Sequence, residues 1–254
     1  MRVLRYLLTA SLLFMMSSCG SNGQTKGPLL ELPALTGKET LIAHTGFIIS
    51  YNTKAHIPEW VAYELTSEEA SGEVPRSGNF GMDPKYHGKQ AMREDYSGSG
   101  WDKGHMAPAA DMKWSEESMH DSFYLTNICP QNHTLNEKDW HSLEKKVRDW
   151  AKRFGSVYIV CGPIIGENTY GSLGHNKVLI PDAFFKAVLV PYQGSYRSMA
   201  FVMQNNEEHH TLKEYSMTVN ELEKLIGANL FTALDDSVEE SIEDGLDHHF
   251  FGIR

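Results

Sequence analysis

The sequence predicts an α+β fold, with a single domain built around a central, mostly antiparallel sheet. The chain has 254 residues, which is enough for one large domain with a real hydrophobic core. Its 41% hydrophobic and 11% aromatic content is typical of a globular chain rather than a disordered one. Strand-like and helix-like segments follow one another without strict alternation, which favours α+β over a parallel α/β fold.

Short apolar runs bounded by polar or turn-forming residues predict the strands. In chain order they are residues 47–51, 60–65, 123–129, 157–161, 184–190 and 198–203. We expect Pro58 to mark the bend between the first two strands and Pro130 to break the third. The run at 157–161 is continuously apolar, so we place it at the centre of the sheet. Residues 67–100 are rich in Gly, Ser, Pro and charge, and we expect mostly loop there.

The clearest helix is predicted over residues 136–154, where apolar residues recur at helical spacing and Gly155 follows. The other expected helices are short and cover residues 115–121 and 219–226, the latter ended by Gly227. Residues 235–247 are strongly acidic, so we expect a solvated helix or loop near the C-terminus.

The N-terminal segment predicts export. In residues 1–19, two arginines precede an apolar run at 6–16 that is shorter than the ~20 residues a bilayer span needs. Small residues then precede Cys19, as in the bacterial lipobox, so we expect lipidation there and a lipoprotein in the periplasm, outer membrane or cell surface. The alternative is an ordinary signal peptide with an incidental cysteine. Residues 20–40 would form a tether, and residues 41–254 the domain.

Charge and cysteine content limit the functions that fit. The formal net charge of −10 argues against a surface that is basic overall, although a local basic groove remains compatible with it. In an exported protein, Cys129 and Cys161 suggest a disulfide. Two buried free thiols are the alternative, because both cysteines lie in apolar runs.

Residues 101–111 form a polar segment, which we expect to be an exposed turn that presents His105 before Pro108. A neutral imidazole can accept a proton from water near neutral pH, which makes it a natural general base. A lone histidine is more often structural, and the chain has 12. Position alone therefore does not assign a role to His105.

The helix at 136–154 carries two further candidates. At 100° per residue, Asn136 lies between Leu143 and Val147 on the apolar stripe, and Glu144 borders it. Asn136 could cap the helix or point a ligand oxygen into a cleft, and helix geometry leaves both open. Glu144 could instead be a surface residue paired with Arg148 at i+4. A neutral amide oxygen suits Mg²⁺ and is a poor ligand for zinc.

Together, Asp102-Lys103-Gly104-His105 and the downstream Asn127, Asn136 and Glu144 resemble the DNA/RNA non-specific endonuclease family. The family hallmark is Asp-Arg-Gly-His, so lysine replaces the usual arginine here. The resemblance covers roughly residues 45–235 and implies a ββα-metal (His-Me) finger site in the α+β domain. It also implies Mg²⁺-dependent hydrolysis of DNA and RNA, with Mn²⁺ as a substitute ion. Dimerisation is common in the family, so a homodimer is among the expected assemblies.

The resemblance implies a role for each matching residue. His105 matches the general base, Asn136 the direct metal ligand, and Glu144 the residue that orders the metal's water. Asn127 matches an asparagine that holds the local structure. The remaining matches are Arg76, for the transition-state phosphate, and Lys103, which offers a phosphate a point charge without bidentate geometry. We expect Asp102 to shape the turn.

Two rival functions remain open. The acidic charge favours a phosphodiesterase that acts on other phosphate diesters. A non-catalytic surface lipoprotein with the same fold would have no need for a histidine base beside a metal ligand. The adjacent pairs His209-His210 and His248-His249 show no zinc motif such as CxxC or HExxH.

Overall fold

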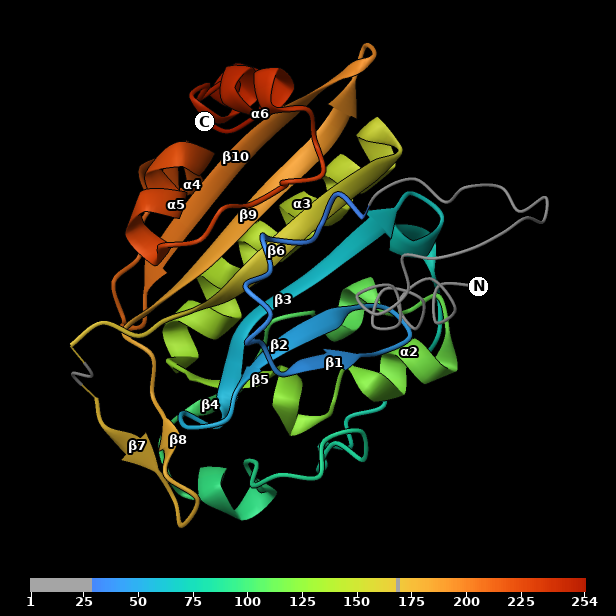
Figure 1. The fold of residues 1–254 in the computed structure, drawn as a ribbon. Coiled ribbons are helices and arrows are strands. Elements are labelled where there is room, and N and C mark those ends of the chain that lie inside the picture. Colours follow the sequence, from blue (N-terminus) through green and yellow to red (C-terminus); the bar gives the residue numbers. More distant parts are fainter. Residues whose placement is uncertain (1–28, 168–169) are drawn as a thin grey trace, which may run out of the picture.

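Seven antiparallel strands form the central sheet of the computed structural model, which describes residues 29–167 and 170–254 (Figure 1). In spatial order they are β1 (Leu41–Ala43), β2 (Ile48–Asn52), β3 (Ile57–Thr66), β6 (Ser156–Ile164), β9 (Ala183–Tyr192), β10 (Ser195–Gln204) and β11 (Ser216–Met217). Every neighbouring pair is antiparallel, which confirms the predicted fold class. The expected leader at 1–19 and the lipidation site Cys19 lie outside the described residues.

Two small sheets stand apart from the central one. One pairs β4 (Asp102–His105) with β5 (Ile128–Gln131), and the other pairs β7 (Ser172–Leu173) with β8 (Val178–Leu179). The expected turn at 101–111 is therefore wrong over its first half, which is strand β4.

The strand expected at 123–129 is also displaced. A single 3₁₀ turn occupies Leu125–Asn127, and β5 begins after it and continues through Pro130. Proline is tolerated there because β5 belongs to a two-stranded ladder, where a missing N–H need not interrupt pairing on both sides. Pro58 likewise lies inside β3, opposite Tyr51, and not at the bend.

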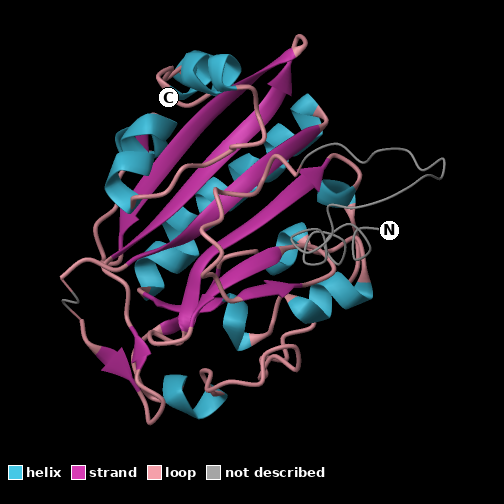
Figure 2. Ribbon diagram, in the orientation of Figure 1, coloured by secondary structure: helices cyan, strands magenta, loops and turns pink. Residues whose placement is uncertain are grey.

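Helices cover both faces of the central sheet (Figure 2). Helix α3 (His141–Phe154) packs on one face, and α5 (Val219–Ile226) and α6 (Asp236–Glu243) pack on the other. The alternation along β9 separates the two cores: Phe184 and Val188 belong to the α3 side, and Phe185 and Leu189 to the other side. This is the period of two expected for a sheet that is buried on both faces.

Two segments expected to be solvated contribute to the core on the α5 and α6 side of the sheet, which we call the second core. Leu29 and Leu30, within the segment predicted to be a tether, are buried there, so the folded part begins no later than residue 29. Ile242 and Glu243 of α6 are also buried, so the acidic segment at 235–247 is not simply a solvated helix or loop. Its apolar side chains provide a packing face that its overall charge conceals.

The helix ends follow the expected capping chemistry. Gly155 and Gly227 have positive φ angles of 90° and 68° and end α3 and α5, as predicted. Thr218 caps α5 by accepting a hydrogen bond from the Glu221 amide. The remaining helical elements are short: η1 (Glu69–Ser71), η2 (Arg93–Tyr96), η3 (Ala109–Asp111), α2 (Glu116–Asp121), α4 (Leu212–Tyr215) and α7 (His248–Phe251).

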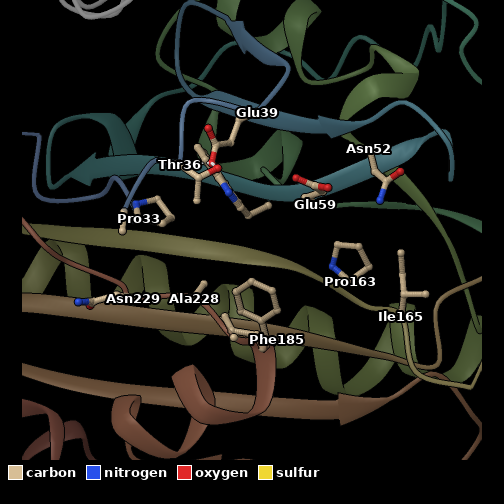
Figure 3. Close-up of a pocket in the computed structure, with 14 residues that line it drawn as sticks. Pro33, Thr36, Glu39, Asn52, Glu59, Pro163, Ile165, Phe185, Ala228 and Asn229 are labelled. Atoms are coloured by element: carbon tan, nitrogen blue, oxygen red, sulfur yellow. Dashed lines mark hydrogen bonds between the residues drawn. The ribbon is translucent and has the colours of Figure 1, made fainter. Parts of the chain in front are cut away.

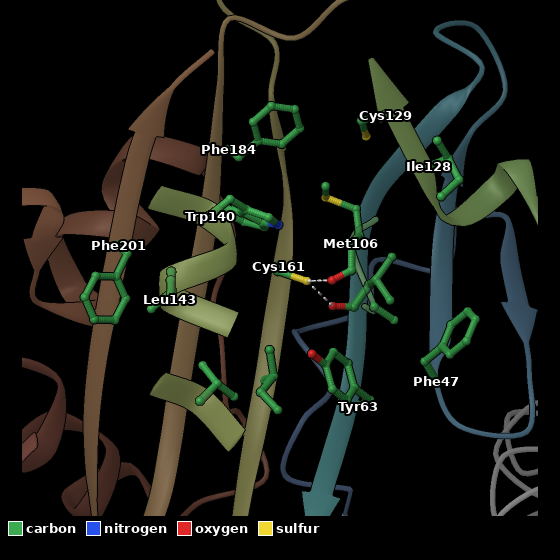
Figure 4. Close-up of a cluster of buried hydrophobic side chains, with 14 of the residues drawn as sticks. Phe47, Tyr63, Met106, Ile128, Cys129, Trp140, Leu143, Cys161, Phe184 and Phe201 are labelled. Carbon is green, nitrogen blue, oxygen red and sulfur yellow. Dashed lines mark hydrogen bonds between the residues drawn. The ribbon is translucent and has the colours of Figure 1, made fainter. Parts of the chain in front are cut away.

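Cys129 and Cys161 are both free thiols in the α3-side core, so the disulfide hypothesis is wrong and the alternative of two buried thiols is confirmed. The Cys161 thiol donates a hydrogen bond to the Met106 carbonyl oxygen at 3.2 Å (Figure 4). Within the described residues, no helix combines the length and apolar character needed to cross a bilayer.

Candidate active site

A cavity of about 410 Å³ lies beside β4 and the start of α3, and it brings five of the six candidate residues of the domain together. Its polar lining comprises Arg76, Lys103, His105, Asn136, Glu137, His141 and Glu144. The residues come from a loop, a strand and a helix that lie far apart in sequence. Asn127 does not line this cavity.

His105 is the last residue of β4, and its side chain is buried rather than exposed as predicted, at 8% accessibility. Its ring packs against Phe123 and Phe80, at centroid distances of 5.0 and 5.4 Å. Burial, reinforced by the nearby charge of Arg76, lowers the pKa of His105 to about 3. Its Nε2 has no hydrogen-bond partner among the described residues. The imidazole is therefore neutral near pH 7, and the residue lines the cavity.

Asn136 lies in a π-helical segment, Leu135–Trp140, that leads directly into α3. Its Nδ2 donates a hydrogen bond to Asp102 Oδ2 at 2.9 Å, which leaves Oδ1 as the atom available to a cation. The capping alternative is wrong, because Asn132 Oδ1 accepts the amides of Thr134 and Leu135 instead. Asp102, the first residue of β4, therefore orients the side chain of Asn136.

Glu144 is buried on α3, one helical turn after Trp140. Burial raises the pKa of Glu144 to about 7, although the positive charge of Lys186 opposes this rise. The alternative, a surface pair with Arg148, is not formed, because Arg148 donates to Asp111 Oδ1 at 2.8 Å. Near neutral pH this carboxyl can thus change protonation state.

The two cations at the cavity lie against aromatic rings. The Arg76 guanidinium is 5.1 Å from the centroid of the Phe123 ring, and Lys103 Nζ is 5.3 Å from that of Tyr96. Within the described ranges, neither side chain forms an ion pair with a carboxylate. Both charges therefore remain available to an anionic ligand.

Asn127 does not line the cavity but holds the backbone next to His105. Its fully buried amide accepts a hydrogen bond from the Ala107 nitrogen and donates to the Ala107 oxygen, both at 2.9 Å. Trp140 Nε1 donates to the His105 carbonyl at 3.3 Å. These bonds fix the backbone that carries His105.

The donor set fits a hard cation better than zinc. In the part of the chain that the structure describes, no three His, Cys, Asp or Glu side chains converge as metal ligands. The amide oxygen of Asn136 and the carboxyl of Glu144 in the same cavity fit Mg²⁺, which retains water and accepts phosphate oxygens. His209, one of the histidines considered for zinc, instead pairs with Asp139.

A second cavity, of about 420 Å³, lies on the opposite side of the central sheet (Figure 3). Its wall includes Trp60 and Phe185 from the second core. The two carboxylates in this lining, Glu39 and Glu59, accept hydrogen bonds from Thr36 and Ser50. None of the candidate catalytic residues lines it.

The sequence is similar to a known protein family and to named nucleases. Residues 27–237 match the model of the DNA/RNA non-specific endonuclease family. The mitochondrial nuclease EXOG of Xenopus laevis is 36% identical over 229 residues, which cover 84% of this chain and 64% of that protein. Human mitochondrial endonuclease G is 30% identical, over 76% of this chain and 70% of that protein.

A bacterial relative and a solved structure agree with this. A nuclease of Nostoc is 31% identical over 84% of this chain and 81% of its own length. The crystal structure of the EndoG/EndoGI complex matches with a TM-score of 0.74 and 25% identity, over 80% of this chain and 90% of that one. The chain spans just under two thirds of the Xenopus EXOG protein. The resemblance found in the sequence is thus confirmed, and the chain belongs to the DNA/RNA non-specific endonuclease family.

Proposed function

We propose that this protein is an exported, metal-dependent endonuclease that hydrolyses the phosphodiester bonds of DNA and RNA without sequence specificity. The observation that carries the proposal is the neutral imidazole of His105, which lines the same cavity as Asn136 and Glu144. Family membership and relatives named as nucleases support it.

His105 would act as the general base. Its neutral imidazole takes a proton from water, and the resulting hydroxide attacks the phosphorus of the scissile phosphate. The ring cannot turn away easily, because Phe80 and Phe123 pack against it and Asn127 holds the adjoining backbone. A fixed base of this kind reduces the cost of reaching the reactive geometry.

Asn136 would hold the divalent cation through Oδ1, and the carboxylate of Glu144 would orient the water around it. When bound, Mg²⁺ would stabilise negative charge on the phosphate and on the leaving 3′ oxygen. As the P–O3′ bond breaks, that oxygen takes up a proton from water, which gives 5′-phosphate and 3′-hydroxyl ends. Mn²⁺ has compatible oxygen-ligand preferences and would substitute.

Arg76 and Lys103 would bind the phosphate itself. Neither reads a base edge in this role, so cleavage would depend on the backbone of the nucleic acid and not on its sequence. Arg76 can contact two phosphate oxygens at once, whereas Lys103 supplies a single point charge. We therefore expect Arg76 to contribute more to stabilising the transition state.

The test is cleavage of plasmid DNA and of RNA by the purified protein, with Mg²⁺, with EDTA, and with His105→Ala. We expect cleavage of both substrates, abolished by EDTA and reduced about 10²- to 10⁴-fold by the substitution. His249→Ala removes an exposed histidine on α7 and serves as the matched control.

Two other results would redirect the assignment. Hydrolysis of small diesters without cleavage of long nucleic acid would support the rival phosphodiesterase, which the net charge of −10 motivates. A folded protein that hydrolyses neither with Mg²⁺ nor with Mn²⁺ would contradict catalysis and favour the binding lipoprotein.

We also propose that the chain is exported and anchored by a lipid on Cys19. The support is the sequence alone: Arg2 and Arg5, an apolar run, and small residues before the cysteine. Membrane fractionation of the protein and of Cys19→Ser tests the anchor. Recovery of both proteins in the soluble fraction would contradict it.

A further inference from the structure

His44 is a buried histidine with a carboxylate close to each nitrogen of its ring. It lies in the turn between β1 and β2 and is fully buried. Its Nε2 is 2.8 Å from Asp83 Oδ2, and its Nδ1 is 3.5 Å from Asp121 Oδ2. Both aspartates are buried as well. These three residues form the His44 cluster, which does not line the cavity of the candidate active site.

The geometry of the cluster favours a protonated imidazole. A neutral imidazole donates through one nitrogen only, whereas an imidazolium donates through both and carries a positive charge. The separation of 3.5 Å at Nδ1 is that of an ion pair rather than of a short hydrogen bond. Burial by itself would lower the pKa of His44, but Asp121 and Asp83 together outweigh it and the pKa is raised. His44 thus supplies the positive charge that two buried carboxylates require.

Asp83 and Asp121 belong to different segments, and the turn that carries His44 contacts both. Asp83 lies in the loop between η1 and η2, and Asp121 is the last residue of α2. The Thr45 amide donates a hydrogen bond to Asp121 Oδ2 at 3.0 Å. The Thr126 hydroxyl donates to Asp83 Oδ2 at 2.6 Å. The His44 cluster therefore holds together segments that are far apart in sequence.

The same segments supply the two aromatic rings that pack against His105. Phe80 comes three residues before Asp83, and Phe123 comes two residues after Asp121. The centroids of the two rings are 5.0 Å apart. The carboxylates that bind His44 therefore lie within one turn of chain from the side chains that cover the proposed general base.

Backbone hydrogen bonds join these segments between the cluster and the rings. The Gly81 amide donates to the Phe123 oxygen at 3.2 Å, and the Leu125 amide donates to the Gly81 oxygen at 2.9 Å. The Phe123 ring also packs against the Arg76 guanidinium. A shift of the Asp83 loop relative to α2 would thus be transmitted to the side chains at the cavity.

We infer that His44 is a positioning residue for the general base: as an imidazolium it holds the Asp83 loop against α2 and thereby fixes the two rings that pack on His105. The inference rests on the proposed function, because the placement of His105 matters there for activating water. The arrangement is sensitive to pH, since the cluster is complete only while His44 carries its proton.

Other titratable groups lie around the cluster, on each of the segments that pack on it. Those that face His44 or its two carboxylates are Asp83, Lys85, Glu117, His120, Asp121 and Tyr124. Because the pKa of His44 is raised on folding, its stabilising effect is fully present below the ordinary value of about 6.5 and is lost as the pH rises through the raised value. Burial raises the pKa values of Asp83 and Asp121, but hydrogen bonds, including those with His44, lower them overall. Their contribution is therefore lost only in acid.

The direct test is an NMR titration of the histidine side chains of the wild-type protein without metal. We expect His44 to titrate above the ordinary histidine value, and the ring protons of His105 to shift with the same midpoint as the two packed rings move. His105 itself, whose pKa is lowered to about 3 by burial, stays neutral throughout this range. In His44→Gln this shift should disappear, whereas a shift caused by other groups at the cavity would persist. His87→Gln removes an exposed histidine of the Asp83 loop and should leave the shift unaltered.

Kinetics provide a second measurement. We expect kcat of His44→Gln to fall about tenfold, because the base is less well placed, while the Mg²⁺ concentration for half-maximal cleavage stays unchanged. His44→Arg keeps a permanent positive charge with donors for both carboxylates. It should restore kcat and remove the fall in kcat that the wild type shows as the pH rises through the pKa of His44.

Two results would overturn the inference. A His44 that titrates at or below the ordinary value would contradict the protonated cluster, and a His105 signal that does not follow His44 would contradict the positioning role. Removing one partner from a buried group of charges can unfold a protein. If His44→Gln does not fold, the wild-type titration still decides, with His44 assigned by its NOE to Phe47, whose ring centroid is 5.0 Å away. The titration is independent of cleavage, so a protein without nuclease activity would disprove the proposed function and still test the effect of His44 on His105.

Discussion

Asp102 determines which atom Asn136 presents to the cavity. An asparagine amide can offer either a donor nitrogen or an acceptor oxygen, and only the oxygen can bind a cation. By accepting the Nδ2 hydrogen bond at 2.9 Å, Asp102 occupies the nitrogen and leaves the oxygen free. The first residue of the Asp-Lys-Gly-His segment thus supports the residue proposed as the metal ligand, although the two lie far apart in sequence.

Asp102→Ala should therefore weaken metal binding without removing a ligand. We expect the Mg²⁺ concentration for half-maximal cleavage to rise about tenfold to a hundredfold, as for other residues that orient metal ligands. Cleavage at saturating Mg²⁺ should change less. His133→Ala is the control, because it removes the other partner of Asp102 and leaves the bond to Asn136 intact. An unaltered Mg²⁺ dependence of Asp102→Ala would contradict the orienting role.

Sequence reasoning identified the residues of the cavity better than those that support it. Arg76, Lys103, His105, Asn136 and Glu144 were all predicted, and the structure brings them together. The orienting contact of Asp102 was missed because it joins a strand to a helix start across a gap in sequence. The burial of His105 was missed because neither of the aromatic rings that cover it lies near it in the motif.

At the scale of elements, the π-helical segment Leu135–Trp140 sets the direction of Asn136 relative to Glu144. A π turn contains one residue more than an α turn, which rotates the preceding residues about the helix axis by roughly 100°. The predicted angular position of Asn136 assumed a regular α-helix from residue 136 onward. That assumption fails in this segment, while α3 after it is regular.

Deletion of Lys138, an exposed residue of this segment, should return it to α-helical register. We expect the fold to persist, since α3 and its packing are unchanged, and cleavage to fall by a factor of about 100 or more as Asn136 turns away. Circular dichroism and a thermal melt establish folding beside the cleavage assay. Lys138→Ala keeps the length of the segment and should remain active. A fully active deletion variant would show that the register is unimportant.

The predicted strands and helix ends agree with the structure where the sequence carries a single strong signal, an apolar run or a terminal glycine. The apolar runs located β6, β9 and β10, and glycine marked the ends of α3 and α5. The strand at 123–129 failed because the side chain of Asn127 bonds backbone groups of Ala107 and Ser122, contacts that no local pattern reveals. The solvated segment predicted at 235–247 was wrong because the prediction used only its charge. The apolar residues of α6 pack against the sheet despite that charge.

The whole molecule combines a net charge of −10 with a cavity lined by Arg76 and Lys103, which form no ion pair with any described residue. Such a protein should bind nucleic acid through few phosphate contacts. Association would then gain little from long-range attraction and rely on the immediate surroundings of Arg76 and Lys103.

This predicts a shallow salt dependence of binding. If two phosphates are neutralised, log K for duplex DNA should fall against log[KCl] with a slope of about −2. The His105→Ala protein without metal allows the measurement by fluorescence anisotropy. Arg76→Ala or Lys103→Ala should each reduce the slope by about 1. A slope steeper than about −5 would reveal an extended basic surface and contradict this picture.

The order of strands in the central sheet has a consequence for how the protein behaves among copies of itself. Its two outermost strands are the shortest of the sheet: β1 has three residues and β11 has two. The ten-residue strands β3, β9 and β10 are all interior, with partners on both sides. Little unpaired backbone is left at either edge to template another chain. The long, apolar strands that would otherwise promote aggregation are thereby protected against strand addition.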